Sequence, residues 1–202
     1  MENGYNFKYF EVIRVYKINA CCYICNMRFI FTDIENTIID DLVNCNFLEE
    51  NCKKITKLLK EEDPVCFNFF TWGWKMPTDV DINIVNSMLV KLGIDPMNIG
   101  YDCRVIPKSA SVQTAIETGW LKQEDFDRAI EPGMMSEFGI SKVSCFTEFV
   151  QMGISETLLK QANATVKDPV EFWLIDDLVE KKETIELYGG KVKIILVNPT
   201  EL

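Results

Sequence analysis

Apolar positions along the chain fall into short continuous runs that alternate with segments of helical periodicity. Runs rich in aromatic and β-branched residues, bounded by polar or turn residues, predict buried strands. Between them, apolar residues recur every three to four positions, which predicts amphipathic helices. Strands separated by helices are typical of βαβ units with right-handed crossovers, so we expect an α/β fold with a mainly parallel central sheet. The predicted strands cover residues 28–32, 64–71, 103–106, 171–175 and 192–197, and the predicted helices cover 52–62, 80–92, most of 111–165, and 178–188.

The same pattern divides the chain unevenly. Residues 1–26 are apolar and aromatic without a clear period, and we treat them as an N-terminal extension. Residues 27–202 then form one domain, with a small helical insertion at about 107–140. Serines that precede apolar-periodic runs are predicted helix N-caps: Ser111, Ser141 and Ser155.

Composition limits the chemistry. The chain has 202 residues, a formal net charge of −10 and no histidine. The negative charge argues against broad nucleic-acid binding, which usually needs a basic face. The absence of histidine excludes Ser-His-Asp and Cys-His catalysis and every His-containing metal site. Acid–base chemistry must therefore use carboxylates, Lys, Tyr or Cys.

The eight cysteines are scattered, and several lie within apolar runs. The first apolar stretch is broken by charged residues, so no secretory signal is evident, and no run approaches the roughly 20 apolar residues of a membrane span. We expect a cytoplasmic protein with reduced, mostly buried thiols and no membrane association. An alternative for Cys21, Cys22 and Cys25 is a metal site, although no second cluster accompanies them.

Acidic residues end two of the predicted strands. Asp33 and Glu35 follow the first, Asp176 and Asp177 follow the fourth, and Thr71 ends the second. In parallel sheets, ligands bind outside the carboxyl ends of the strands. If these strands are neighbours, their carboxylates crowd one edge, and a hard cation would offset the repulsion. Oxygen-only ligation is typical of Mg²⁺.

A carboxylate beside Mg²⁺ is able to attack a phosphoryl group and form an aspartyl phosphate, a route that needs no histidine. Three segments in order support this interpretation: residues 29–37, an apolar strand followed by Asp-x-Glu-x-Thr; residues 65–71, an apolar strand ending in Thr; and residues 172–177, a strand ending in a double Asp. Together they resemble the first, second and fourth motifs of the haloacid-dehalogenase-like (HAD) phosphohydrolase superfamily. The resemblance covers about residues 28–199.

The resemblance implies a three-layer Rossmannoid sandwich and a role for each matched residue. Asp33 would be the nucleophile and a metal ligand. Glu35 would supply the general acid/base and a backbone carbonyl ligand. Thr71 would hold the phosphoryl group by its hydroxyl, and Asp176 and Asp177 would bind Mg²⁺ directly or through water.

Two positions depart from the family pattern. Position 35 is Glu, where phosphatases of this family have Asp, and a displacement of the carboxyl by about 1 Å costs on the order of 100-fold in rate. The lysine of the third motif has three candidates, Lys142, Lys160 and Lys167. We favour Lys142, because lysines of this family often open the helix that precedes the fourth motif.

The short distance between Asp33 and Thr71 leaves room only for a flap at about 38–50, which predicts a minimal cap and an open site. In this family an open site goes with a large substrate or a partner that acts as a lid. Trp72 and Trp74 could stack on a base, although packing is their commoner role.

The leading hypothesis is a Mg²⁺-dependent phosphatase for a phosphomonoester, such as a nucleotide or a nucleic-acid end. The alternative is a HAD-like binding or regulatory protein with impaired catalysis. A response-regulator-like receiver fits less well, because its acid pair should follow the first strand.

Overall fold

The computed structural model describes residues 28–62, 66–96, 105–153 and 169–202 of the protein. Within these residues six strands form one sheet. Their order is β3-β2-β1-β4-β6-β5, and all pair in parallel except β5, which is antiparallel to β6. The strand bounds are β1 Arg28–Thr32, β2 Cys66–Phe70, β3 Val105–Ile106, β4 Val170–Ile175, β5 Glu183–Leu187 and β6 Val192–Val197.

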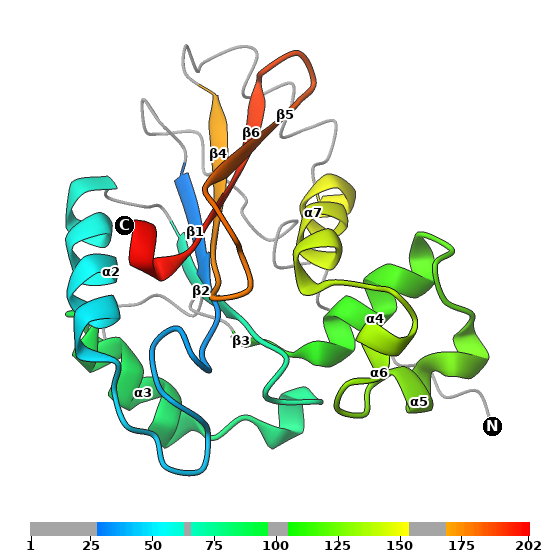
Figure 1. Ribbon diagram of the computed structural model, residues 1–202, viewed down its shortest axis with the longest axis horizontal. Coiled ribbons are helices and arrows are strands. Elements are labelled where there is room, and N and C mark those ends of the chain that lie inside the picture. Colours follow the sequence, from blue (N-terminus) through cyan, green and yellow to red (C-terminus); the bar gives the residue numbers. More distant parts are fainter. Residues whose placement is uncertain (1–27, 63–65, 97–104, 154–168) are drawn as a thin grey trace.

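Helices cover both faces of the sheet, which gives the α/β fold that the sequence predicts (Figure 1). On one face, α2 and α3 pack on a core that includes Ile30, Ile55 and Met88. On the other, α4 and α7 pack on a core that includes Phe31 and Phe146. The helix bounds are α2 Glu49–Glu62, α3 Ile82–Lys91, α4 Lys108–Glu117, α5 Phe126–Ala129, α6 Met134–Glu137 and α7 Lys142–Gly153, with single 3₁₀ turns at Pro77–Asp79, Gln123–Asp125 and Pro199–Glu201.

The central strands are apolar on both faces because helices bury both. In β1 the side chains from Phe29 to Thr32 are all buried, as is every residue of β2. Aromatic contacts join the strands, with the rings of Phe29 and Phe172 stacked at 4.8 Å between centroids. This continuous burial explains why the strands appear in the sequence as apolar runs rather than alternating patterns.

The helix predicted at residues 178–188 is wrong, because this segment contains strand β5. Ile185 and Leu187 are two positions apart and both pack against the core, which is the period of a strand. Ile185 pairs with Ile194, and Glu186 forms an ion pair of 3.5 Å with its cross-strand partner Lys193. The charged residues before β5 suggested a solvated helix face, but β5 forms a hairpin with β6.

Three helices start at residues other than the predicted ones, and the smallest difference is at α3, which begins at Ile82, two residues after the predicted start. Helix α2 begins at Glu49, three residues before the predicted start, and α4 begins at Lys108 with Pro107 as its N-cap. Ser111 therefore lies inside α4, and the predicted cap there is wrong. Ser141 does cap α7, because its Oγ accepts a hydrogen bond of 3.0 Å from the backbone N–H of Ser144.

Some predictions fall on segments outside the described residues. These include the N-terminal extension 1–26 with its three clustered cysteines, the Ser155 cap, and the first two residues of each of the predicted strands at 64–71 and 103–106. Among the helices that the structure describes, none has the length and apolarity required to cross a membrane.

Candidate active site

The sheet reverses its direction of growth between β1 and β4. The chain passes from β1 outward to β2 and β3, whereas the strands after β4 are added on the other side. Such a switch point opens a crevice at the carboxyl ends of the two strands, and it is the common ligand site of open α/β sheets. Asp33 and Asp176 directly follow β1 and β4, so both lie at this crevice.

Backbone hydrogen bonds continue the sheet past the strand ends and hold these acids in place. The N–H of Asp33 donates to the carbonyl of Ile175 at 2.8 Å, and the N–H of Asp176 donates to the carbonyl of Val197 at 3.1 Å. The two residues are thus anchored on a three-strand platform of β1, β4 and β6. Their placement on regular elements limits the freedom of the carboxylates.

Three carboxylates converge at the switch point. Oxygens of Asp33, Asp176 and Asp177 all lie within 4.8 Å of one another. The Asp33 and Asp176 residues are only 5% and 0% exposed, whereas Asp177 is half-buried. Three anions this close, two of them withdrawn from water, require positive charge or protons nearby.

Lys142 brings one positive charge into this group. Its Nζ lies 2.6 Å from Asp33 Oδ2 and 3.0 Å from Asp176 Oδ2, and its side chain is 4% exposed. Lys142 is the first residue of α7, where the helix dipole disfavours a cation, so the helix does not explain its place. Burial lowers the pKa of the Lys142 ammonium, but attraction to Asp33 and Asp176 outweighs it and leaves the pKa raised.

One lysine against three carboxylates leaves a formal charge of −2 in the group. Burial, together with repulsion from Asp176, raises the pKa of Asp33 from 3.8 to about 7 against the opposing attraction of Lys142. Burial and the Asp176 charge also raise the pKa of Asp177. In the absence of a further cation, the group therefore tends to take up a proton.

The donor set fits a hard divalent cation. Asp176 Oδ2 is buried and, although Lys142 Nζ is at ion-pair distance, no donor among the described residues meets it in hydrogen-bond geometry. The residual charge of −2 matches one divalent ion, and carboxylate oxygens are the ligands that Mg²⁺ prefers. The acidic triad is thus suited to hold a metal ion.

Asp177 is positioned through its backbone. Its N–H donates to Thr37 Oγ1 at 3.3 Å, and its carbonyl accepts from Asn198 Nδ2 at 3.0 Å. Asn198 also donates to the carbonyl of Val179 at 2.9 Å, so it fixes the turn that follows β4. Sequence reasoning missed Asn198; its signal is a polar residue directly after the apolar run of β6.

Thr71 directly follows β2, which lies next to β1. The register pairs Thr32 with Phe69, which places Thr71 near the end of the same sheet edge as Asp33. Its side chain is fully buried, and its Oγ1 accepts a hydrogen bond of 3.0 Å from the N–H of Gly73. Among the described residues no acceptor takes the hydroxyl proton of Thr71, so this hydroxyl is able to donate a hydrogen bond to a ligand.

Glu35 is half-buried and its carboxylate is not part of the acidic triad. Its Oε2 instead lies against Gly73, in the segment that follows Thr71. The Glu35 charge contributes to the raised pKa of Asp177, after burial and the Asp176 charge. The predicted metal role of Glu35 concerned its backbone carbonyl, and its side chain lies beside the triad.

The two tryptophans after β2 differ in environment. Trp74 is 7% exposed and belongs to the core between the sheet and α2 and α3. Trp72 is half-buried, and its Nε1 donates to Ser111 Oγ at 2.8 Å. The Lys108 ammonium lies 5.8 Å from the centre of a Trp72 ring. Packing therefore accounts for both side chains.

The helical insertion is smaller than predicted. The first part of residues 107–140 is α4, which packs beside α7 in the layer on the sheet, and only α5, α6 and their turns project from it (Figure 1). Lys75 forms an ion pair of 2.5 Å with Glu131, and the buried Lys108 ammonium donates to the Glu131 carbonyl. These contacts tie the projecting part to the carboxyl ends of β2 and β3.

Of the three candidate lysines of the third motif, only Lys142 falls within the described residues, and the structure brings it to Asp33. Lys160 and Lys167 lie outside them.

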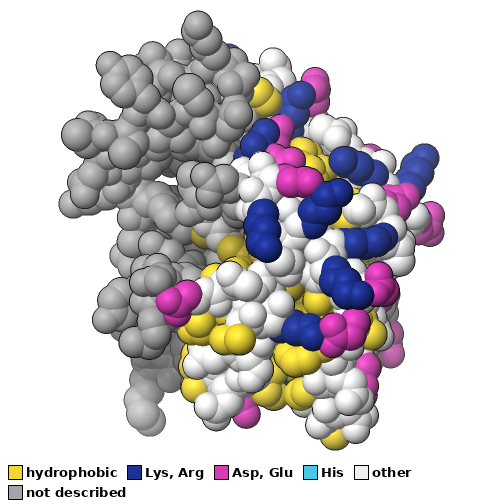
Figure 2. Space-filling view, turned by 90° about the vertical axis from the view of Figure 1, so that its left-hand side faces the viewer, with side chains coloured by type: hydrophobic (Ala, Val, Ile, Leu, Met, Phe, Trp, Pro, Cys, Tyr) yellow, Lys and Arg dark blue, Asp and Glu magenta, His cyan; other side chains and the backbone are white. Residues whose placement is uncertain are grey.

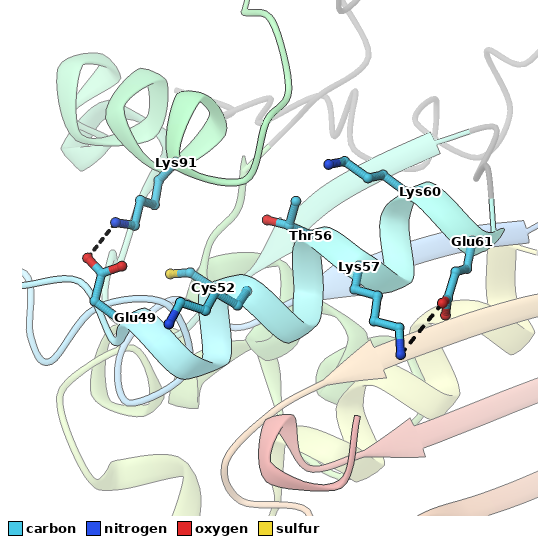
Figure 3. A pocket seen from close by; sticks show the side chains of 8 residues that line it. Glu49, Cys52, Thr56, Lys57, Lys60, Glu61 and Lys91 are labelled. Atoms are coloured by element: carbon cyan, nitrogen blue, oxygen red, sulfur yellow. Dashed lines mark hydrogen bonds and ion pairs between the residues drawn. The ribbon is translucent and has the colours of Figure 1, made fainter.

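A surface pocket of about 600 Å³ lies away from the acids, on the outer side of α2 and against Lys91 of α3 (Figure 3). Lysine side chains gather on this side of the molecule, with acidic side chains among them (Figure 2). Within the pocket, Lys53, Lys57 and Lys91 each form an ion pair with a glutamate. Their charges are largely offset, so the pocket gives no separate argument for an anionic ligand.

The fold and the site together define an α/β protein whose switch point holds three carboxylates around a buried lysine. Comparisons of the chain with protein-family models, with curated proteins and with solved structures found no match.

Proposed function

We propose that this protein is a Mg²⁺-dependent phosphatase that hydrolyses a phosphomonoester through an aspartyl phosphate on Asp33, as the resemblance to HAD-like phosphohydrolases implies. The observation that carries the proposal is the short contact between Lys142 and Asp33 beside Asp176 and Asp177. It supports the role of Asp33 as a nucleophile, because a neighbouring ammonium favours the ionised carboxylate and offsets charge on an incoming phosphoryl group.

In the first step, a carboxylate oxygen of Asp33 attacks phosphorus, and the bond from phosphorus to the ester oxygen breaks. The leaving oxygen takes the proton of the Glu35 carboxylic acid and departs as the alcohol. The Thr71 hydroxyl donates a hydrogen bond to a phosphoryl oxygen and keeps its proton, and its Oγ1 is free to do so because it serves only as acceptor for the Gly73 N–H among the described residues. The products are the alcohol, the aspartyl phosphate and ionised Glu35.

In the second step, water attacks phosphorus and gives a proton to the Glu35 carboxylate. The bond between phosphorus and Asp33 breaks, which releases phosphate and restores the Asp33 carboxylate and the Glu35 acid. Asp33, Asp176 and Asp177 are the residues that would hold Mg²⁺, which when bound supplies positive charge beside the phosphoryl oxygens. Lys142 remains charged throughout and holds Asp33 in line.

The direct test compares the wild-type protein with Asp33→Asn, using p-nitrophenyl phosphate and Mg²⁺. The substitution keeps the shape of the side chain but removes the nucleophile, so we expect turnover to fall by at least about a thousandfold. The exposed Asp127 on α5 offers a matched control, since Asp127→Asn should leave turnover unchanged. Equal turnover by wild type and Asp33→Asn would exclude the proposal.

A second candidate is a HAD-like binding or regulatory protein that has lost catalysis. It is favoured by position 35, which is Glu in this chain and Asp in phosphatases of the family. The Glu35 carboxylate also lies outside the triad. This candidate predicts that Mg²⁺ stabilises the protein without any Asp33-dependent turnover of aryl or nucleoside phosphates.

The substrate of the leading proposal remains a phosphorylated compound, of nucleotide size or larger.

A further inference from the structure

Gly73 makes an unusually close approach to Glu35. A β-carbon built on Gly73 would lie 2.5 Å from Glu35 Oε2 and 3.1 Å from Glu35 Cδ. It would also lie 2.7 Å from Leu42 Cδ1, in the flap between β1 and α2. The space that a side chain at position 73 would fill is therefore occupied by the Glu35 carboxyl group.

The backbone does not require glycine at this position. The glycines with positive φ among the described residues do not include Gly73, so its conformation is open to any L-residue. What glycine contributes here is the absence of a side chain. Its two neighbours in the sequence, Trp72 and Trp74, carry large side chains.

The segment around Gly73 is held firmly. Its N–H donates to Thr71 Oγ1 at 3.0 Å, and the carbonyl of the buried Trp74 accepts from the N–H of Lys108 at 2.9 Å. Glu35, in contrast, follows β1 and carries its carboxyl group at the end of a longer, half-buried side chain. A fixed backbone at Gly73 and the Leu42 side chain thus form a slot that limits where the carboxyl group can lie.

We propose that Gly73 and Leu42 are positioning residues for Glu35. The slot that they form holds the Glu35 carboxyl group at the place from which the carboxyl group of a shorter aspartate would deliver its proton. The inference rests on the proposed phosphatase function. It explains why the extra methylene of Glu35 is compatible with catalysis: the missing Cβ of Gly73 provides the room that the methylene needs. The same contact places Glu35 against the residue that hydrogen bonds to Thr71.

The inference predicts that positions 73 and 35 are energetically coupled. Gly73→Ala would displace only the ends of two flexible side chains, so the fold and its melting temperature should be retained. The displaced carboxyl group should lower kcat by about 100-fold, as expected for a misplacement of about 1 Å, with little change in KM. In a Glu35→Asp background the shorter side chain no longer meets the added methyl group, and Gly73→Ala should change kcat by less than about threefold.

Leaving-group dependence separates a displaced acid from a general structural fault. An alkyl phosphate needs a proton on its leaving oxygen, whereas p-nitrophenolate leaves with little help. Gly73→Ala should therefore slow the single-turnover release of an alkyl alcohol much more than the burst of p-nitrophenol. Leu42→Ala, which widens the slot from the other side, should show the same leaving-group dependence with a smaller loss of rate. It replaces Gly73→Ala as the test variant if Gly73→Ala does not fold.

The outcomes are distinct. If the wild-type protein shows no Asp33-dependent turnover, the proposed function fails and this inference falls with it. If the wild type turns over and Gly73→Ala keeps the full rate, or loses the same factor with Glu35 and with Glu35→Asp, the slot is rejected while the phosphatase proposal stands. A large loss with Glu35 that disappears in the double variant supports the slot.

Discussion

Lys142 Nζ lies 2.6 Å from Asp33 Oδ2, and both side chains are almost completely buried. The two residues come from elements that are far apart in the sequence, the start of α7 and the end of β1. A second contact of 3.0 Å joins Lys142 to Asp176, so one ammonium holds two carboxylates that would otherwise repel each other. The charge balance of the switch point therefore depends on this one lysine.

Replacing Lys142 with methionine should lower both the stability of the protein and its turnover. The substitution keeps a similar side-chain volume but leaves Asp33 and Asp176 buried without a counter-charge. Removal of one partner from a buried ion pair costs about 3–5 kcal/mol of stability. We expect the free energy of unfolding, measured by urea denaturation at about pH 8 in chelator, to fall by that amount. Turnover should fall by about 10²–10³-fold, because a charge that stabilises the transferring phosphoryl group is lost.

The exposed Lys60 on α2 provides the control for this change. Lys60→Met alters the same chemical group on the surface, so its effect on unfolding should stay within about 0.5 kcal/mol. Similar stability for the two variants would show that the Lys142 contacts contribute nothing beyond ordinary surface charge.

Removal of one triad carboxylate should weaken metal binding without collapse of the fold. Asp177 is half-buried and is held through its backbone, so Asp177→Asn keeps the hydrogen bonds of Thr37 and Asn198. We expect Mg²⁺ to raise the melting temperature of the wild-type protein by mass action, and the concentration needed for half of this effect to rise at least about tenfold in the variant. A Mg²⁺ response identical to that of Asp127→Asn would exclude Asp177 as a ligand.

The strands and their terminal acids were predictable because both are local properties of the sequence. A run such as Phe29–Phe31 has no polar side chain to solvate, so it signals a strand buried on both faces, and the abrupt appearance of Asp33 after Thr32 marks where the sheet meets its crevice. The sequence left the adjacency of β1 and β4 as a condition, because no local pattern records which strands pair. It is the structure that brings Asp176 beside Asp33.

Other features depend on contacts that no local pattern records. Three lysines had comparable sequence contexts, and no local pattern records that the first residue of α7, Lys142, lies beside Asp33. The strand β5 was missed because its pairing with β6 outweighs the helical character of the charged residues before it. The close approach of Gly73 to Glu35 is equally tertiary, since the sequence shows only a glycine between two tryptophans.

Thr37 connects the segment after β1 to the segment after β4, and its hydroxyl should matter more than its shape. Thr37→Val retains the volume of the side chain but leaves the N–H of Asp177 without its acceptor at 3.3 Å. We expect a loss of about 1–3 kcal/mol in the free energy of unfolding and a weaker Mg²⁺ response, because Asp177 is no longer held at the site. Thr147→Val on α7 is a suitable control, since that hydroxyl only donates back to the helix carbonyl of Val143. If both variants behave alike, Thr37 serves packing alone.

The raised pKa of Asp33 predicts how stability without metal depends on pH. Burial and Asp176 raise the pKa of this carboxyl from 3.8, its value in the unfolded chain, to about 7 in the folded protein. Below the unfolded pKa both states bind the proton, and the contribution to stability is fully present. Between these two pKa values the folded state retains a proton that the unfolded state has lost, so stability falls as the pH rises through this window and levels off above it.

Urea denaturation in chelator, repeated from about pH 4 to pH 8, measures this effect as the difference in unfolding free energy between the wild type and Asp33→Asn. The difference should decline as the pH rises toward about 7, because the asparagine variant has no carboxyl at position 33 to titrate. Saturating Mg²⁺ should remove the decline, since a cation in the triad favours the ionised carboxylate and lowers its folded-state pKa. A difference that grows with pH in the metal-free protein would mean that attraction to Lys142 outweighs burial and that Asp33 is already ionised at low pH.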